Sequence, residues 1–362
     1  MRRIAVSCVK DEAPYLVEWI AYQRLIGFDH VIIAANDSTD GTNEILSALQ
    51  RRGYCTFIEF SRAGHKIPPQ MAGLSLIADH PEMRDSALVL VSDIDEYLQI
   101  NVGDGRLDDL LTAAPDFDVM LLRWRIFGSN GDLEYSDGTT IERFKTASPT
   151  SFNGHIFDFF NPDVTLPADG STPPAPQLFD RYRSQRWSRT YKSLFKYFPG
   201  DKLSVHIPRT GRENLAKVDG AGRVDPPENY SHLQYYGSYT YDDSYKLAQL
   251  NHYANRSVDE YLFKILRGDG IYAEDPRGLD HWKVAECNEV AVDAMDRYFL
   301  PLNKAVAEMI DDCAIADLLT ESKRRRAERL SESLQQSAQL AELREHMRTY
   351  AGATFPRSIR LP

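Results

Sequence analysis

The sequence predicts an α/β protein built on a doubly wound, mostly parallel sheet, with flanking helices and a helical C-terminal region. Three observations predict it. Over the first hundred residues, short apolar runs alternate with segments whose apolar residues recur at helical spacing. Polar clusters at residues 10–12, 36–40 and 92–96 each follow one of these runs. From about residue 257 onwards the pattern is largely helical.

The apolar runs are the expected strands, and the periodic segments are the expected helices. Pro14 suits the first turn of a helix, and Gly27 suits the position just beyond its end. The expected strands cover residues 4–9, 30–35, 56–60, 87–91 and 119–122, and the expected helices cover residues 14–26, 42–52 and 68–80. Strands joined through helices run parallel, and such sheets bind ligands at the carboxyl ends of their strands. The three polar clusters should therefore meet at one edge.

For three segments after residue 160, the residue composition indicates the expected structure. Residues 161–177 contain five prolines and predict a surface loop or a lid over an acceptor. Residues 181–196 are rich in arginine, lysine and aromatic side chains. Residues 321–350 are charged, with leucines at loose helical spacing, and predict a terminal amphipathic helix that packs on the body or pairs with a partner.

Charge and cysteine content narrow the class of protein. The net charge is -11, which disfavours a general nucleic-acid binder because phosphate backbones need a basic surface. The four cysteines form no C-x-x-C pair and have no zinc-like spacing with histidine. The first residues lack the apolar core of a signal peptide, and no apolar run is long enough to span a membrane. We expect a cytoplasmic protein, with contact at the inner face of the membrane left open.

The pair Asp93-x-Asp95 is the sharpest chemical feature. It follows the continuously apolar run 88–91 and so lies where a buried strand emerges. Residues two apart in a strand point to the same side, so we expect the two carboxylates to act together. Such a pair suits a hard divalent cation that holds a diphosphate, and magnesium or manganese fits oxygen ligands better than zinc does.

Six short motifs in order resemble those of the family 2 glycosyltransferases, and most closely the bacterial branch related to the family 92 galactan synthases. The motifs are Lys10-Asp11-Glu12 with Tyr15-Leu16-x-Glu18-Trp19 and Gly27-Phe28; Asn36-Asp37-Ser38-Thr39-Asp40-Gly41-Thr42; Ser92-Asp93-Ile94-Asp95-Glu96-Tyr97; Arg123-Trp124-x-x-Phe127-Gly128-Ser129-x-Gly131; Lys192-Ser193 followed by His206-x-Pro208; and Asn251-His252-Tyr253 with Arg256-Ser257, Tyr261, Lys264 and Arg267-Gly268. They span residues 10 to 268, and each is weak alone.

This resemblance implies a GT-A-like fold, a nucleotide-sugar donor, a divalent metal (Mn²⁺ or Mg²⁺) and inversion at the anomeric carbon. It makes Asp93, Asp95 and His252 the metal ligands, with Asp93 also contacting the donor. Three cations, Arg256, Lys264 and Arg267, fall on one face of an expected helix and could hold the diphosphate. A solvated charged face is the simpler alternative for these three residues.

The N-terminal clusters are the expected nucleoside site. The resemblance assigns Lys10, Asp11, Glu12, Asn36 and Asp37 to donor binding, where a carboxylate or amide can hydrogen-bond a uracil edge. Two positions depart from the family pattern. Ala35 stands where many members have an aspartate, and Gln23 stands where a histidine is frequent.

The catalytic base is not identified by the sequence. An inverting transfer needs a group that takes the proton of the acceptor hydroxyl. Asp132 and Glu134 follow the segment that resembles the acceptor-facing motif and are the first candidates; the others are Asp137, Asp158, Asp180, His155 and His206. Aromatic residues that could stack on a sugar, or simply belong to the core, are Trp124, Trp187 and Tyr191.

The expected organisation has three parts: a nucleotide-sugar-binding half at 1–118, an acceptor-binding and catalytic half at 119–268, and a helical extension at 269–362. The expected partners are a UDP-sugar or another nucleotide sugar and a saccharide or lipid-linked acceptor, without nucleic acid. A nucleotidyltransferase is the alternative enzyme, although the loop after the first strand, Lys10 to Pro14, has no glycine. A non-catalytic nucleotide-sugar-binding protein on the same fold is the other alternative.

Overall fold

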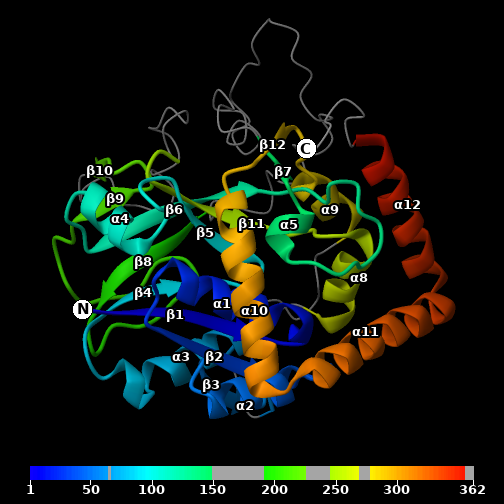
Figure 1. Cartoon of the computed structure of the whole chain (residues 1–362), viewed down its shortest axis with the longest axis horizontal. Helices are drawn as coiled ribbons and strands as arrows, with labels where there is room; N and C mark the ends of the chain where they lie inside the picture. Colours follow the sequence, from blue (N-terminus) through cyan, green and yellow to red (C-terminus); the bar gives the residue numbers. More distant parts are fainter. Residues whose placement is uncertain (64–66, 149–190, 226–244, 269–277, 355–362) are drawn as a thin grey trace, which may run out of the picture.

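The computed structural model describes residues 1–63, 67–148, 191–225, 245–268 and 278–354. Within these residues the chain forms a curled sheet with helices on both faces and a group of helices along one side (Figure 1). The predicted α/β class, with a sheet, flanking helices and a helical C-terminal region, is confirmed. In this described part, no helix combines the length and hydrophobicity needed to cross a membrane.

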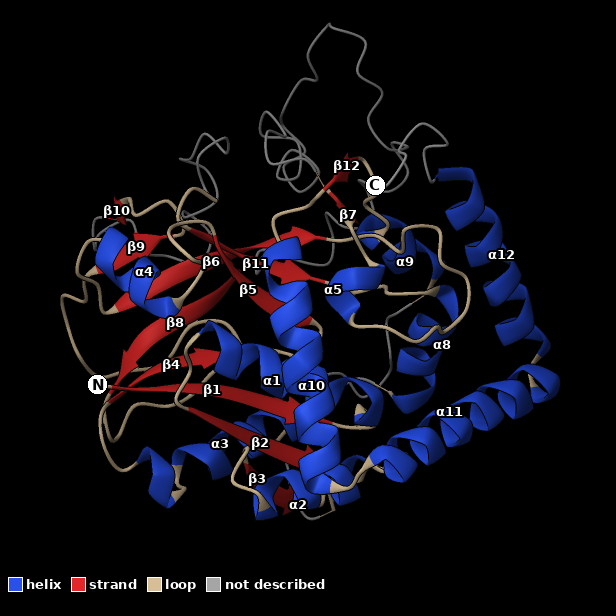
Figure 2. Ribbon diagram, in the orientation of Figure 1, coloured by secondary structure: helices blue, strands red, loops and turns tan. Residues whose placement is uncertain are grey.

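Among the described residues, ten strands belong to one sheet (Figure 2). The strands are β1 (Arg2–Val9), β2 (His30–Asn36), β3 (Thr56–Phe60), β4 (Ala87–Val91), β5 (Glu96–Ile100), β6 (Val119–Ile126), β8 (Tyr191–Tyr197), β9 (Lys217–Asp219), β10 (Val224–Asp225) and β11 (Ala248–His252). The main path runs β10-β9-β6-β8-β4-β1-β2-β3, while β11 pairs with β5 and β6. A separate pair joins β7 (Thr146–Ala147) to β12 (Val290–Ala291).

The strand register brings the three polar clusters to one edge, as predicted. β1 pairs in parallel with β2 and with β4. Val9 lies opposite Ala35, and Val6 lies opposite Val91, so the residues that follow each strand emerge side by side. The sheet also crosses the expected boundary at residue 118, because β8 lies between β4 and β6 and is antiparallel to both.

Successive side chains along the strands point to opposite faces of the sheet and pack into two hydrophobic cores. Side chains such as Ala5, Val31 and Ile33 face one cluster, and their neighbours Ile4 and Ile32 face another. The first core packs under α1 (Leu16–Ile26), α2 (Thr42–Arg51) and α10 (Phe299–Cys313), and the second packs under α3 (Pro69–Ala78). Burial of both faces explains why these strands read as continuous apolar runs.

The remaining helices lie around both ends of the sheet. They are the 3₁₀ turns η1 (Ala13–Tyr15), η2 (Pro81–Met83) and η5 (Asp296–Tyr298), and the helices α4 (Leu107–Ala113), α5 (Thr140–Arg143), α8 (Val258–Arg267), α9 (Leu279–Ala285), α11 (Ala316–Gln336) and α12 (Ala338–Thr354). A third apolar cluster joins α8, α9, α11 and α12. Figure 1 shows α11 passing beneath α8 towards α12.

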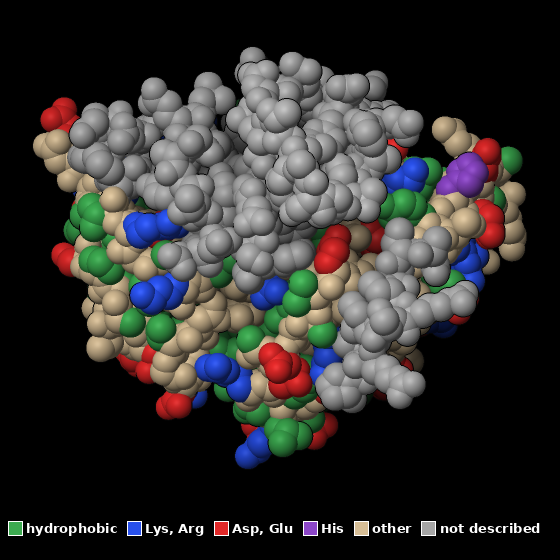
Figure 3. Space-filling view, turned by 90° about the horizontal axis from the view of Figure 1, so that it is seen from above, with side chains coloured by type: hydrophobic (Ala, Val, Ile, Leu, Met, Phe, Trp, Pro, Cys, Tyr) green, Lys and Arg blue, Asp and Glu red, His purple; other side chains and the backbone are tan. Residues whose placement is uncertain are grey.

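Most predicted elements agree with the structure, and one later element differs. The strands expected at 56–60 and 87–91 have those bounds. The single terminal helix expected at 321–350 is two helices. The helix is interrupted at Ser337, which adopts an extended conformation between α11 and α12. The proline-rich segment 161–177 lies outside the described residues. On the described part of the face in Figure 3, basic and acidic side chains are interspersed.

Candidate functional site at the carboxyl edge of the sheet

The acidic motif lies in a turn between two strands. β4 ends at Val91, and Glu96 begins β5, with its N–H bonded to the Asp93 carbonyl oxygen at 3.0 Å. The expectation that Asp93 and Asp95 share one side of a strand is therefore wrong, because strand alternation does not apply within the turn. The turn gives each carboxylate its own set of partners.

Asp93 is held by a buried lysine and an amide. Lys192 donates from Nζ to Oδ2 at 2.9 Å, and Gln70 donates from Nε2 to Oδ1 at 2.8 Å. The Lys192 side chain is fully buried and also lies 3.5 Å from Glu96. Burial alone would lower the pKa of Lys192, but the two carboxylates outweigh it and raise that pKa, so the ammonium stays charged.

Asp95 lies between a lysine and a histidine. Lys264 donates from Nζ to Oδ2 at 2.5 Å, and the Nε2 atom of His252 lies 3.8 Å from Oδ1. Burial would raise the pKa of Asp95, but Lys264 and the neighbouring cations hold it below its usual range. Asp95 is therefore a buried, ionised carboxylate with one firm cationic partner.

His252 reaches the motif from the far end of the chain because β11 pairs antiparallel with β5, which sets His252 opposite Glu96. Its ring lies 4.4 Å from that of Trp124, and Nδ1 has no hydrogen-bond partner in the described structure. Burial lowers the pKa of His252 to about 4, so the imidazole is neutral at pH 7 and can donate a lone pair.

The predicted metal set comes together only in part. Asp95 and His252 offer a carboxylate oxygen and a neutral nitrogen to one position, and these donors suit a divalent cation. Asp93 is turned to Lys192 and Gln70 instead. Consistent with this arrangement, no three His, Cys, Asp or Glu side chains in the described ranges cluster as a metal site.

The three predicted cations converge, although not through a shared helix face. α8 begins at Val258, so Arg256 precedes it in a turn with φ 53°. The guanidinium of Arg256 lies 3.5 Å above the ring of Tyr15, donates to the Ile94 carbonyl at 3.2 Å, and lies 3.7 Å from Glu12. The prediction that Arg256 lies on the same helix as Lys264 and Arg267 was wrong, and the turn before α8 positions Arg256 instead.

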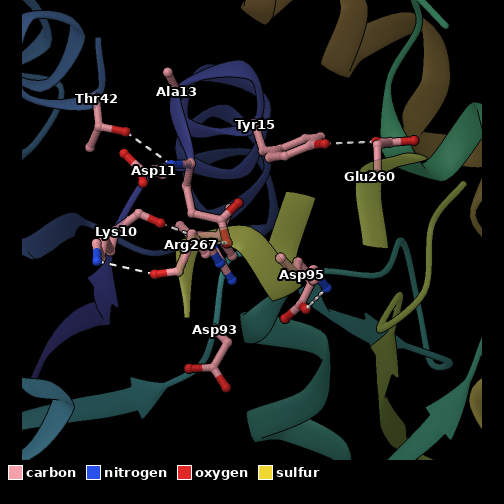
Figure 4. A network of polar contacts seen from close by, with 12 residues as sticks. Lys10, Asp11, Ala13, Tyr15, Thr42, Asp93, Asp95, Glu260 and Arg267 are labelled. Atoms are coloured by element: carbon pink, nitrogen blue, oxygen red, sulfur yellow. Dashed lines mark hydrogen bonds and ion pairs between the residues drawn. The ribbon is translucent and has the colours of Figure 1, made fainter. Parts of the chain in front are cut away.

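The end of α8 is locked to the end of β1. Arg267 forms an ion pair with Glu12 and donates to the carbonyl oxygen of Lys10 at 2.9 Å, while Lys10 donates to the carbonyl oxygen of Arg267 at 3.1 Å. Figure 4 shows Lys10 and Arg267 meeting near Asp93 and Asp95. Residues separated by more than 250 positions thus line one region.

The residues predicted to bind the nucleoside are held by hydrogen bonds with one another and with neighbouring loops. Asp11 is almost fully buried with φ 51°, and its Oδ1 accepts from the N–H of Thr39 at 2.6 Å. Asp37 accepts from Ser61 and from the N–H of Arg62, which together hold its pKa below the usual range. The amide of Asn36 donates to Asp37 at 3.3 Å. The loops after β1 and β2 are thereby joined.

The two base candidates have different surroundings. Asp132 lies 3.7 Å from Arg143, and burial raises its pKa. Glu134 is 69% exposed and lies 3.4 Å from Arg348 of α12. Among the described residues neither one forms a hydrogen bond or ion pair with Asp95, so both remain predictions. Of the other candidates, Asp137 forms an ion pair with Lys323, the carbonyl oxygen of His206 accepts from Ser193, and His155, Asp158 and Asp180 lie outside the described residues.

Sequence reasoning assigned no role to Glu260, which links three segments. Its carboxylate accepts from Tyr15 at 2.7 Å and from both terminal nitrogens of Arg143, at 3.1 and 2.7 Å. It also accepts from Ser257, the residue that caps α8. The only available signal was the capping box formed by Ser257 and Glu260, which indicates a helix start and not a site.

Three solved structures are similar to this chain. TarS 1–349 from S. aureus in complex with UDP is 15% identical over 61% of this chain and 62% of that chain, with a TM-score of 0.27. Uncomplexed TarS 1–349 is 12% identical over 100% and 93%, with a TM-score of 0.27. A proposed glucose-1-phosphate thymidylyltransferase from Bacillus anthracis is 11% identical over 39% and 61%, with a TM-score of 0.25.

All three TM-scores lie below 0.5, and the chain spans less than two thirds of the first two matched chains, 61% and 62%. No curated protein matches the sequence. The family model for glycosyltransferase family 92 matches residues 5–261, which include the acidic turn, His252 and the first turn of α8. This match covers well over half of the sequence, and the chain therefore belongs to glycosyltransferase family 92.

Proposed function

We propose that this family 92 glycosyltransferase moves a sugar from a nucleotide sugar, expected to be a UDP-sugar, to a hydroxyl of a saccharide or lipid-linked acceptor with inversion. The observation that carries the proposal is the convergence of Asp95, Lys264, His252 and Arg267 at the carboxyl edge of the sheet. Buried cations at this edge can bind and neutralise a diphosphate, and the neighbouring polar loops can hold its nucleoside.

In the proposed reaction, the acceptor oxygen forms a bond to the anomeric carbon while the bond from that carbon to the diphosphate breaks. Lys264 and Arg267 would stabilise the negative charge that the nucleoside diphosphate carries away. Asp95 and His252 would hold a Mn²⁺ or Mg²⁺ ion, which would supply further positive charge to the leaving group. Asp93, fixed by Lys192, would orient the donor.

Asp132 is the better supported of the two base candidates. Its raised pKa favours proton uptake from an acceptor hydroxyl, whereas Glu134 is exposed and paired with Arg348. Trp124, beside His252, offers a ring on which a sugar could stack.

The test is release of nucleoside diphosphate from a panel of nucleotide sugars, with and without manganese and with candidate acceptors. We expect release from one donor in wild type and its loss in Asp95→Ala. The matched control is Asp85→Ala, because Asp85 is exposed and precedes β4, whereas the acidic motif follows that strand. Equal turnover in Asp95→Ala and wild type would contradict the proposed site.

Two further readouts separate the alternatives. Release of pyrophosphate from a nucleoside triphosphate and a sugar phosphate would identify a nucleotidyltransferase instead. Calorimetric binding of UDP without turnover of any donor would support a non-catalytic binding protein. Manganese dependence of UDP binding, weakened in His252→Ala, would support the metal site independently of turnover.

A further inference from the structure

Helix α11 carries two arginines onto the loop that follows β1. Arg326 donates from one terminal nitrogen to the Asp11 carbonyl oxygen at 2.7 Å, and Arg329 lies 3.3 Å from the Asp11 carboxylate. Arg329 also donates to the carbonyl oxygen of Leu266 on α8 at 3.0 Å. α11 follows the segment matched by the family model, which ends at residue 261. An element outside the matched segment thus touches the proposed donor site.

Arg326 occupies a position on α11 that would ordinarily be apolar. The buried residues of α11 are Leu319, Ser322, Arg326 and Leu330, which recur at helical spacing on one face. Burying a guanidinium is costly unless its surroundings compensate for the lost water. Here its carbon Cζ lies 3.7 Å above the ring of Phe263, in addition to the bond to Asp11. The preceding residue Arg325 points outward and pairs with Glu321 on the same helix.

Both arginines contact Asp11, whose backbone conformation is unfavourable without stabilising contacts. Asp11 has φ 51°, a left-handed conformation that costs a non-glycine residue about 1 kcal/mol or more. Arg326 holds its carbonyl oxygen, while Arg329 and Thr39 hold its carboxylate. The next residue, Glu12, pairs with Arg267 and lies near Arg256. The position of Glu12 therefore depends on the conformation that α11 fixes at Asp11.

We propose that Arg326 and Arg329 are positioning residues that make α11 a structural part of the donor site. They hold the Asp11–Glu12 loop against the end of α8, so that the nucleoside cluster and the diphosphate cations keep one geometry before the donor arrives. This inference rests on the proposed function. Neither arginine is a catalytic residue, because Arg326 acts through Asp11, and Arg329 acts through Asp11 and Leu266.

The experiment measures nucleotide binding and donor kinetics in point variants. Wild type, Arg326→Ala, Arg326→Lys, Arg329→Ala and the control Arg325→Ala are titrated calorimetrically with UDP, GDP and dTDP in the presence of manganese. We expect the Kd of the bound nucleotide to rise about tenfold in Arg329→Ala and further in Arg326→Ala, with Arg325→Ala unchanged. We expect kcat at saturating donor to stay within about twofold in Arg329→Ala, because the loss is in donor binding.

General destabilisation is separated from positioning by two measurements. Thermal unfolding without nucleotide should show Arg329→Ala folded at the assay temperature, since its side chain is 40% exposed. Arg326→Lys should recover part of the affinity that Arg326→Ala loses, because an ammonium can still donate to the Asp11 carbonyl oxygen. Loss of kcat with unchanged donor KM would overturn the inference.

The same titrations keep the two proposals apart. If wild type binds a nucleotide and both Arg326→Ala and Arg329→Ala bind it with unchanged Kd, the role of α11 is refuted and the proposed function stands. If wild type binds none of the three nucleotides, the donor site itself is refuted, and the inference falls with it.

Discussion

Replacing Glu260 with glutamine should destabilise the protein strongly, because one carboxylate joins three segments. Glu260 accepts hydrogen bonds from Tyr15 of η1, from Arg143 of α5 and from Ser257 at the start of α8. Its side chain is 2% exposed and that of Arg143 is 7% exposed. Glu260→Gln removes the negative charge and leaves a buried guanidinium without its main counter-ion.

The magnitude follows from the pKa of the carboxyl. Burial would raise the pKa of Glu260 from 4.5, but Arg143 and the other donors lower it to about 2. A shift of this size corresponds to about 3 kcal/mol of folding stability. Because the folded pKa is the lower one, this stability is fully present above about pH 4.5 and is lost as the pH falls towards 2. Removing one member of a buried ion pair costs about 3–5 kcal/mol, in agreement with this value.

Urea unfolding of wild type and Glu260→Gln between pH 3 and 7 tests the reasoning. We expect the wild type to be more stable by about 3 kcal/mol at pH 7, with a smaller difference at pH 3. Arg143→Met added to Glu260→Gln should recover part of the loss, because it removes the unpaired guanidinium. A difference below about 1 kcal/mol at pH 7, or one that does not change with pH, would refute the assignment.

Two further predictions concern the loop after β6. Gly128→Ala should lower the melting temperature, because the added Cβ would lie 2.2 Å from Oδ1 of Asn288; Gly211→Ala, with no atom within 4 Å of its new Cβ, is the control. An unchanged melting temperature in Gly128→Ala would contradict this close packing. Asp132→Asn should reduce kcat about 100-fold or more with donor KM little changed, while Glu134→Gln should reduce it far less; the reverse order would make Glu134 the better base candidate.

The fold was predictable where residues close together in the sequence determine the structure. Buried strands such as 87–91 contain only apolar residues, and polar residues follow them directly, so their ends could be placed to the residue. The turn at Asp93–Asp95 could not be placed, because a run of polar residues does not distinguish a strand end from a tight turn. The helix break at Ser337 carries no glycine or proline to mark it.

The partners of the site residues were less predictable than the residues themselves. The acidic motif and His252 could be singled out, but nothing in the sequence pairs Asp93 with Lys192, which is 99 positions away. Arg326 stands among other arginines in a segment that looks like a solvated charged face. Its burial against Tyr15 and Phe263 and its hydrogen bond to Asp11 depend on how α11 packs, which the sequence does not show.

The reciprocal bonds between Lys10 and Arg267 also have a consequence for the order of folding. They join positions 257 residues apart, so the chain between them must be closed into a loop before they can form. Contacts of such long range form late, because loop closure costs entropy that local contacts do not. A ribosome-bound chain that ends before α8 can form β1 to β4 but has no counterpart for Lys10 and Glu12. We therefore expect nucleotide affinity to appear only after α8 has been synthesised and has packed against the end of β1.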